Sequence, residues 1–330
     1  MRYSTVGSKI AANNWNSNMH TNTLMQKDNI MPVTRALLAA AILLPTAFAN
    51  AATATRGTVY VAGFTTKQIY RVDYHYDGAD TLTVSAPAVL ASVSNLSYGL
   101  AVTPDRYLLV AGQGQVSRIK LPTGAMSTVN PHNNCNTIVV DPAGATAWAG
   151  WKDTAISSIP LHPFADGTTH TVSGDDSVAT EITFTPANGV FYTTGGEDRN
   201  GDVGMIDLAT FHTTRLFSNF EATGIHYDAF SASVIFAAFG KARQFNPASP
   251  GALLSSRDDS AAGDNYMDIA PDGQGHLLAT SFGGTLVLID YSATGLIGDV
   301  STRRVSAPMA LSGATDVVYD PILFADGFEP

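Results

Sequence analysis

The stretch "YGLAVTPDRYLLVAGQGQVSRIKLPTG", residues 98–124, contains three short apolar segments that are separated by two turns. In the first segment the apolar Leu100 and Val102 lie two residues apart, which is the period of a β-strand. The first segment ends at Pro104 and Asp105, residue types that favour a tight turn after a strand. The stretch therefore predicts three consecutive β-strands.

The same pattern recurs at residues 136–161, 180–211, 223–251 and 265–292. The residues that end the first strands are Pro104, Pro142, Pro186, Ala229 and Pro271, at steps of 38, 44, 43 and 42 residues. The positions four and two residues before these turns are apolar in every copy: Leu100 and Val102, Ile138 and Val140, Ile182 and Phe184, Ile225 and Tyr227, Met267 and Ile269. A period near forty with three or four strands per unit indicates the blades of a β-propeller.

One further copy is split between the two ends of the chain. Residues 57–74, "GTVYVAGFTTKQIYRVDY", match the second and third strands of the repeat and have no first strand before them. Residues 314–321, "ATDVVYDP", supply the missing part, with Val317 and Tyr319 at the apolar positions. The sequence therefore predicts an all-β, six-bladed β-propeller over residues 52–321, whose first blade is closed by the C-terminal strand.

The region before the repeat is typical of an export signal. Residues 31–51 combine Arg35, an apolar run too short to span a bilayer, and small residues suited to cleavage near Ala49 or Ala51. A buried core helix is the alternative. Residues 1–30 are polar and rich in Asn, and we interpret them as a dubious or disordered extension before the true start. We expect a periplasmic or secreted protein of a Gram-negative bacterium.

Charge and cysteine content narrow the possible partners. Without residues 1–51 the chain carries 14 basic and 27 acidic residues, and no basic cluster offsets this excess. A nucleic-acid partner is therefore not expected, because phosphate binding needs a basic face. No transmembrane segment is expected in the mature chain. Cys135 is the single cysteine, so an intrachain disulfide is impossible and a small buried hydrophobic role is expected.

Through the repeat, of which "PDRYLLVAGQGQVSRIKLPTG" is the best match, residues 57–321 resemble six-bladed propellers of the SMP-30/gluconolactonase, NHL and YVTN-repeat types. The resemblance implies the fold, but such proteins include lactonases, esterase-like enzymes and non-catalytic binding modules. The terminal segment 322–330, "ILFADGFEP", is similar to an F-x-DGFE ending found on exported Gram-negative proteins. A sorting tag and a frayed chain end are the two interpretations of this tail.

Polar residues near the start of the first strands are candidates for a site at the channel mouth. They are Asn136, Glu181, His226, Asn265, Asp268 and Asp316. Carboxylate and amide oxygens that converge on one axis suit a hard cation such as Ca²⁺, and the expected metal set is Glu181, Asn136 and Asp316. Polar residues that line a wet channel without a metal are the alternative.

The expected metal set of Glu181, Asn136 and Asp316 lacks the sequence motifs of the lactonases that the chain resembles. These lactonases have a metal set of one Glu, two Asn and one Asp, with EGP-like and ND-like motifs, whereas here Ile follows Glu181 and Thr follows Asn136.

A second candidate metal site is the loop "GGEDRNGDVG", residues 195–204, where Asp198, Asn200 and Asp202 are spaced as at the start of a calcium loop. Val and Ala occupy its sixth and twelfth positions, so a glycine-rich hairpin tip explains the loop equally well.

No nucleophile elbow, zinc-protease helix, phosphate-binding loop or C-x-x-C motif is present in the sequence. We therefore expect an exported, non-catalytic binding or scaffold protein that takes a small molecule or a protein at the channel mouth. A metal-dependent lactonase or hydrolase using Glu181, Asn136 and Asp316 is the alternative, and a structural surface protein is a third possibility.

Overall fold

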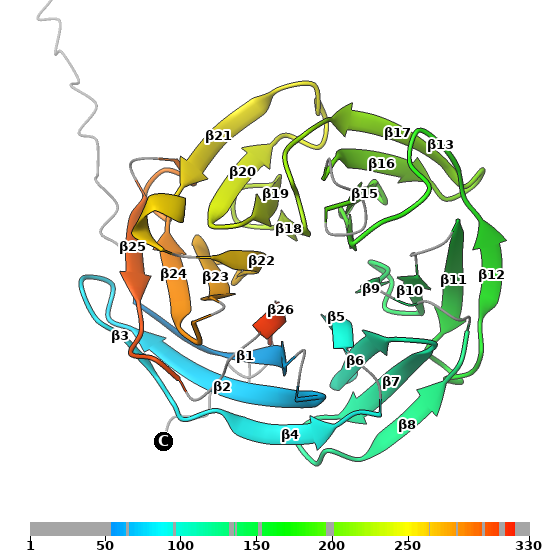
Figure 1. Ribbon diagram of the computed structural model, residues 1–330, viewed down its shortest axis with the longest axis horizontal. Coiled ribbons are helices and arrows are strands. Elements are labelled where there is room, and N and C mark those ends of the chain that lie inside the picture. Colours follow the sequence, from blue (N-terminus) through cyan, green and yellow to red (C-terminus); the bar gives the residue numbers. More distant parts are fainter. Residues whose placement is uncertain are drawn as a thin grey trace, which may run out of the picture. The chain divides into compact units, whose positions relative to one another are not determined.

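The computed structural model describes residues 54–63, 66–94, 97–131, 135, 137–150, 154–195, 201–263, 265–281, 283–298, 301–309 and 314–320. These residues form six sheets arranged as blades around a common axis (Figure 1), so the predicted six-bladed β-propeller is confirmed. The expected extension, signal peptide and C-terminal tail lie outside the described residues. Within the described ranges, no helix has the length and apolar character needed to cross a membrane.

In five blades the chain runs outward from an innermost strand through three more strands. Blade 2 contains β5 (Ser97–Val102), β6 (Tyr107–Gly112), β7 (Gln115–Lys120) and β8 (Met126–Val129). Blade 3 contains β9 (Thr137–Val140), β10 (Thr146–Gly150), β11 (Ala155–Pro160) and β12 (Thr168–Thr171). Blade 4 contains β14 (Glu181–Phe184), β15 (Val190–Thr193), β16 (Val203–Asp207) and β17 (His212–Phe217), with the short β13 (Ser173–Gly174) added parallel to β17.

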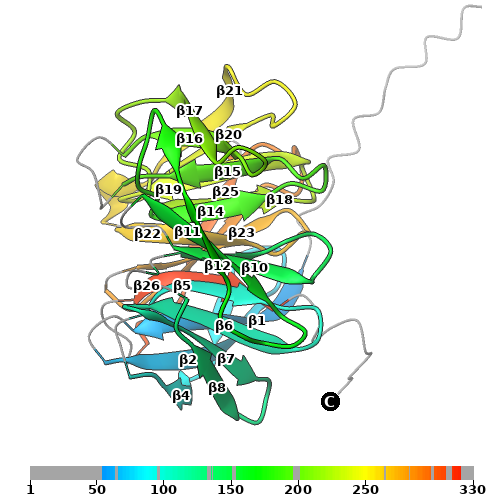
Figure 2. The same ribbon diagram turned by 90° about the vertical axis from the view of Figure 1, so that its right-hand side faces the viewer.

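Blades 5 and 6 follow the same plan. Blade 5 contains β18 (Gly224–Asp228), β19 (Ser233–Ala238), β20 (Lys241–Phe245) and β21 (Leu253–Asp258). A 3₁₀ turn, η1 (Ser260–Ala262), leads to blade 6, which contains β22 (Tyr266–Pro271), β23 (His276–Ser281), β24 (Leu286–Asp290) and β25 (Thr302–Val305). Figure 2 shows the blades from the side, with inner strands such as β26 and β5 next to each other.

Blade 1 is assembled from both ends of the described chain. Its strands are β26 (Ala314–Tyr319), β1 (Thr55–Gly63), β2 (Gln68–Tyr76), β3 (Leu82–Val84) and β4 (Ala88–Ser92). β26 pairs antiparallel with β1 and places Val317 opposite Val61, as Figure 1 shows for the red strand beside the blue one. Asp320, directly after β26, accepts hydrogen bonds from Tyr60 at 3.2 Å and from Arg106 of blade 2 at 2.9 Å. The C-terminal strand therefore closes the ring, as predicted.

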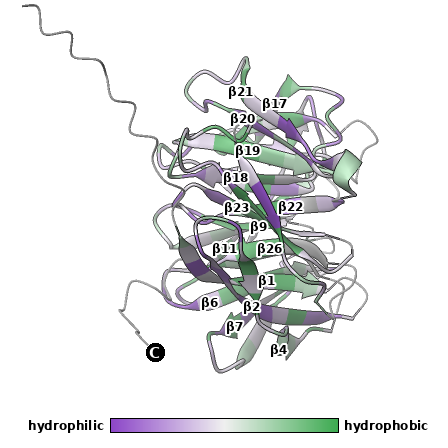
Figure 3. Ribbon diagram, turned by 90° about the vertical axis from the view of Figure 1, so that its left-hand side faces the viewer, coloured by the Kyte–Doolittle hydropathy of each residue, from purple (hydrophilic) through white to green (hydrophobic). Residues whose placement is uncertain are grey.

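The core is divided among the six seams between neighbouring blades, with one cluster of buried apolar residues at each seam. Figure 3 shows hydrophobic and hydrophilic segments along the strands of the blades. Where the structure describes their side chains, the residues four positions before the first-strand turns are at most 3% exposed: Leu100, Ile138, Ile182, Ile225 and Val317. Full burial of such a side chain is worth about 1.5–3 kcal/mol, so these positions help to hold blade to blade. Cys135 is fully buried in the seam between blades 2 and 3, as expected.

Candidate functional site

Three of the six channel-mouth candidates lie together on neighbouring inner strands. Glu181 begins β14, His226 lies in β18 and Asp268 lies in β22. His226 Nε2 is 3.0 Å from Glu181 Oε1 and 3.1 Å from Asp268 Oδ1. Each residue thus offers one atom that could bind a metal ion, and these three atoms lie within 4.8 Å of one another. We call these three residues the channel cluster.

The second oxygen of each carboxylate fixes its side chain to the next blade. Glu181 Oε2 accepts a hydrogen bond from the backbone N–H of Ile225 at 2.9 Å. Asp268 lies where the register of β22 against β23 shifts, and its Oδ2 accepts from the backbone N–H of Val317 in β26 at 2.9 Å. Such a bulge re-aims a strand side chain. One oxygen of each carboxylate is therefore held by an inner strand, while the other faces His226.

Two threonines make comparable links between inner strands. Thr137 Oγ1 accepts from the N–H of Ile182 at 3.1 Å, and Thr183 Oγ1 accepts from the N–H of Tyr227 at 3.0 Å. These bonds satisfy backbone donors on the inner edges of β14 and β18, which face no further strand of their own blade. Polar side chains of the inner strands thus stabilise contacts between blades, and the channel cluster belongs to this series.

Burial and mutual charge control protonation in the channel cluster. Burial, followed by the nearby Asp268 carboxylate, raises the pKa of Glu181 well above its ordinary value. Burial alone would lower the pKa of His226, but the carboxylates of Glu181 and Asp268 outweigh it and raise the pKa of His226. Without a bound cation, the cluster therefore retains protons near neutral pH that the same residues would release in an unfolded chain.

A cavity of about 180 Å³ adjoins the channel cluster. Glu181, Thr183 and His226 form its polar wall, whereas aliphatic residues of β5, β9, β14 and β26 form the rest. A cavity of roughly 150 Å³ is large enough for a molecule the size of benzene. The arrangement therefore suits a small ligand with one polar end and a short apolar body.

The other sequence candidates are not part of this cluster as described. Asn265 is exposed just before β22, and Asp316 lies opposite Ala62 in β26, with its side chain outside the described part of the structure. Asn136, Asp198 and Asn200 lie outside the described residues. Asp202 is 1% exposed and pairs with Arg215 at 2.8 Å. The expected calcium sets therefore remain predictions.

Gly99 lies in β5, the inner strand of blade 2. A Cβ atom on Gly99 would lie 2.9 Å from the backbone nitrogen of Ile138 in β9. Real Cβ atoms essentially never come so close to backbone, so a glycine here lets the inner strands of blades 2 and 3 approach each other. This part of the inner ring is backbone against backbone, and the polar cluster lies in blades 4 to 6.

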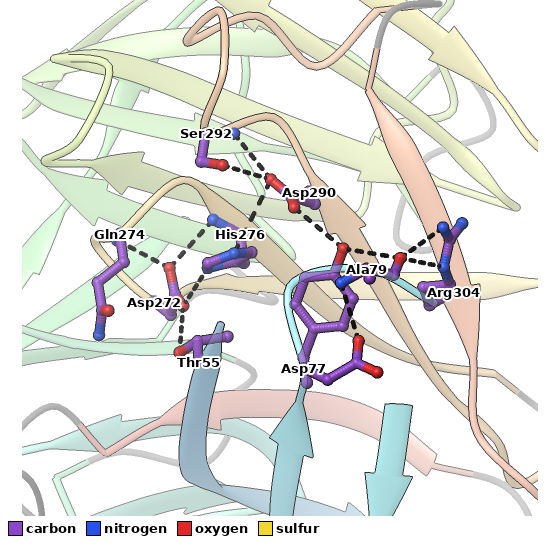
Figure 4. A network of polar contacts seen from close by, with 10 residues as sticks. Thr55, Asp77, Ala79, Asp272, Gln274, His276, Asp290, Ser292 and Arg304 are labelled. Carbon is purple, nitrogen blue, oxygen red and sulfur yellow. Dashed lines mark hydrogen bonds and ion pairs between the residues drawn. The ribbon is translucent and has the colours of Figure 1, made fainter. Parts of the chain in front are cut away.

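A second polar network, which the sequence reasoning missed, crosses the seam between blades 6 and 1 (Figure 4). The fully buried His276 places Nδ1 2.7 Å from Asp272 Oδ2, and Asp272 also accepts a hydrogen bond from Thr55 of blade 1. Tyr76 of blade 1 donates to Asp290 of blade 6 at 3.1 Å. The spacing of Asp272 and His276 across one hairpin turn was the available signal. The network joins the first and last blades.

An open cavity of about 660 Å³ lies beside blades 3 and 4 and was also missed. Its lining includes Trp148, His170 and Phe211, and the rings of His170 and Phe211 stack with centroids 4.2 Å apart. Trp148 also packs against the apolar cluster between these blades. The rings therefore contribute to the seam as well as to the cavity.

Comparisons with known proteins identify the fold alone. No family model matches the sequence, and no curated protein matches it significantly. Among solved structures, a chain of hydrazine synthase from Kuenenia stuttgartiensis superposes with a TM-score of 0.53 at 15% identity, covering 79% of this chain and 89% of that chain. This similarity supports the propeller architecture. The SMP-30, NHL and YVTN resemblances remain interpretations of the repeat.

Proposed function

We propose that this protein is an exported, non-catalytic binding module that holds a small molecule in the cavity beside the channel cluster. The observation that carries the proposal is the composition of the cavity wall, with Glu181, Thr183 and His226 on one side and aliphatic side chains on the other. Such a site fixes the orientation of a ligand through its polar end and contributes affinity through its apolar end. The proposal that the protein is exported is based only on the signal-like sequence of residues 31–51.

A binding role is supported by how the polar groups of the wall are engaged. Thr183 Oγ1 accepts a hydrogen bond from the backbone N–H of Tyr227. One oxygen of the Glu181 carboxylate contacts His226, and the other accepts a hydrogen bond from the N–H of Ile225. The wall is therefore pre-formed and held in place, as a recognition surface requires.

The test is a screen of fragments about the size of benzene by saturation-transfer NMR. Val102→Phe should abolish binding of the hits, because Val102 lines the cavity and the larger ring fills it. Val305→Phe is the matched control, since Val305 is 38% exposed on β25. Hits that bind wild type and Val102→Phe equally, or no hits at all, would contradict the proposal.

The alternative function is a metal-dependent lactonase or hydrolase. It is favoured by the convergence of Glu181, His226 and Asp268 donor atoms within 4.8 Å, because a bound divalent ion polarises a carbonyl group. The assay is hydrolysis of a small aliphatic lactone with added Ca²⁺ or Zn²⁺. If wild type hydrolyses the lactone and Glu181→Gln abolishes this activity, the protein is a hydrolase and the non-catalytic proposal is wrong. If both proteins show only the background rate, the hydrolase alternative is wrong.

A further inference from the structure

We infer that the channel cluster is a binding site for a divalent transition-metal ion of the zinc class, held by Glu181 Oε1, His226 Nε2 and Asp268 Oδ1. The inference deepens the proposed function, on which it rests only for the role of the adjoining cavity. It also departs from the calcium expected at the channel mouth, because a different set of atoms converges there.

The distances are close to those of metal coordination. Zinc binds imidazole nitrogen and carboxylate oxygen at about 2.0–2.2 Å in a tetrahedral arrangement, so two of its ligands are about 3.4 Å apart. His226 Nε2 lies 3.0 Å from Glu181 Oε1 and 3.1 Å from Asp268 Oδ1. Each pair therefore needs to separate by only about 0.3–0.4 Å for an ion to take the place of the proton that Nε2 shares with the two carboxylates.

The ligand types select the class of ion. Ca²⁺ and Mg²⁺ bind almost wholly through oxygen, and Ca²⁺ takes six to eight such ligands in a typical site. An imidazole with two carboxylates is instead a donor set of zinc and its neighbours in the first transition row. His226, between two acids, is therefore the residue that decides against calcium.

The surroundings of the ligands provide independent support. Metal-binding carboxylates are commonly oriented by hydrogen bonds to the oxygen that does not bind the metal. Here the backbone N–H groups of Ile225 and Val317 hold Glu181 Oε2 and Asp268 Oδ2, each at 2.9 Å. The three ligands come from three neighbouring inner strands, so the ring itself sets their separation.

The adjoining cavity gives the ion a role in recognition. A site with three protein ligands keeps at least one coordination position open. Glu181 and His226 line the cavity of about 180 Å³, so an open position on the ion would face it. A small ligand with a carboxylate, hydroxyl or carbonyl oxygen at its polar end would complete the coordination, while its apolar end packs against the aliphatic wall.

The test is calorimetric titration of Zn²⁺, with no organic ligand present, into purified protein freed of metal by a chelator. Wild type should bind one Zn²⁺ per chain, and His226→Gln should weaken binding about 100-fold or more, since loss of even a supporting residue costs about 10–100-fold. His212→Gln is the matched control at an exposed histidine of β17 and should bind as wild type does. Ca²⁺ should give no saturable binding at the concentration where Zn²⁺ saturates.

A readout on wild type covers the case in which a variant fails to fold. In protein labelled with ¹⁵N-histidine, one equivalent of Zn²⁺ should shift the ring-nitrogen resonances of His226. Unchanged His226 resonances, equal Zn²⁺ affinity in His226→Gln, or tighter binding of Ca²⁺ than Zn²⁺ would overturn the inference. Such a failure leaves fragment binding and its loss in Val102→Phe untouched, so it is distinguishable from failure of the proposed function.

Discussion

The backbone N–H of Val317 donates a hydrogen bond of 2.9 Å to Asp268 Oδ2, while the other oxygen of Asp268 faces His226. One carboxylate therefore connects the closing strand of the ring with the channel cluster. The channel cluster and the closure of the ring share this residue, so a substitution of Asp268 is expected to affect both.

Removing the closing strand should open the ring. Deletion of residues 314–330 removes β26 and exposes both the free edge of β1 and the apolar seam with blade 6. Unpaired strand edges associate with other chains, so we expect aggregation, measured by light scattering and size-exclusion chromatography. Deletion of residues 322–330 alone is the control and should leave a monodisperse, cooperatively unfolding protein. A monodisperse product of the longer deletion would contradict the closure.

Asp268→Ala should destabilise the protein strongly. The substitution leaves the N–H of Val317 without this acceptor and removes one of the two carboxylates from His226. Breaking a buried charged pair from one side costs about 3–5 kcal/mol, which urea unfolding measures directly. Asp80→Ala is the matched control, because the exposed pair of Asp80 with Arg304 is worth at most about 1 kcal/mol. Equal losses in the two variants would count against a structural role for Asp268.

Stability should depend on pH through His226 in metal-free protein. The folded pKa of His226 is raised above its unfolded value, so its contribution is complete below the unfolded pKa and is lost as pH rises through the folded one. The raised pKa of Glu181 acts in the same direction. The difference in unfolding free energy between wild type and His226→Gln should therefore be largest in mild acid and shrink towards alkaline pH. Urea titrations in chelator at several pH values give this difference, and growth with rising pH would refute the assignment.

His276 should stabilise the packing of blade 6 against blade 1. His276→Ala removes a fully buried ring and leaves Asp272 without its 2.7 Å partner, so we expect a loss of about 3 kcal/mol in unfolding free energy. His212→Ala, at an exposed position, should change stability by no more than about 0.5 kcal/mol. Equal stabilities of the two variants in urea would show that the network in Figure 4 does not hold the blades together.

The propeller architecture was predictable because the sequence pattern of one blade recurs in the others. Every blade repeats the same apolar pattern, and the match of Val317 and Tyr319 to Leu100 and Val102 gave both the phase and the closing strand. These positions are buried because their side chains face the seams between blades, and strands such as β19 and β23 are buried along their whole length. A single divergent copy, such as the one around Ala229, does not obscure such a pattern.

The site was only partly predictable, since it depends on contacts between blades. His226 and Asp268 lie two positions further along their repeats than Glu181, and the sequence does not reveal that their donor atoms meet. Their meeting depends on the length of the Glu181 side chain and on the register shift in β22, neither of which has a repeat signature. The threonine links were missed for the same reason, whereas the Asp272–His276 pair lies within one hairpin and its spacing of four residues was a local signal.

An anomalous difference map, recorded above and below the zinc edge from crystals grown with Zn²⁺, would locate an ion in the channel cluster directly. We expect one peak at about 2.0–2.2 Å from Glu181 Oε1, His226 Nε2 and Asp268 Oδ1, facing the cavity. A map with no peak at these atoms, or with zinc only at surface histidines, would contradict this expectation.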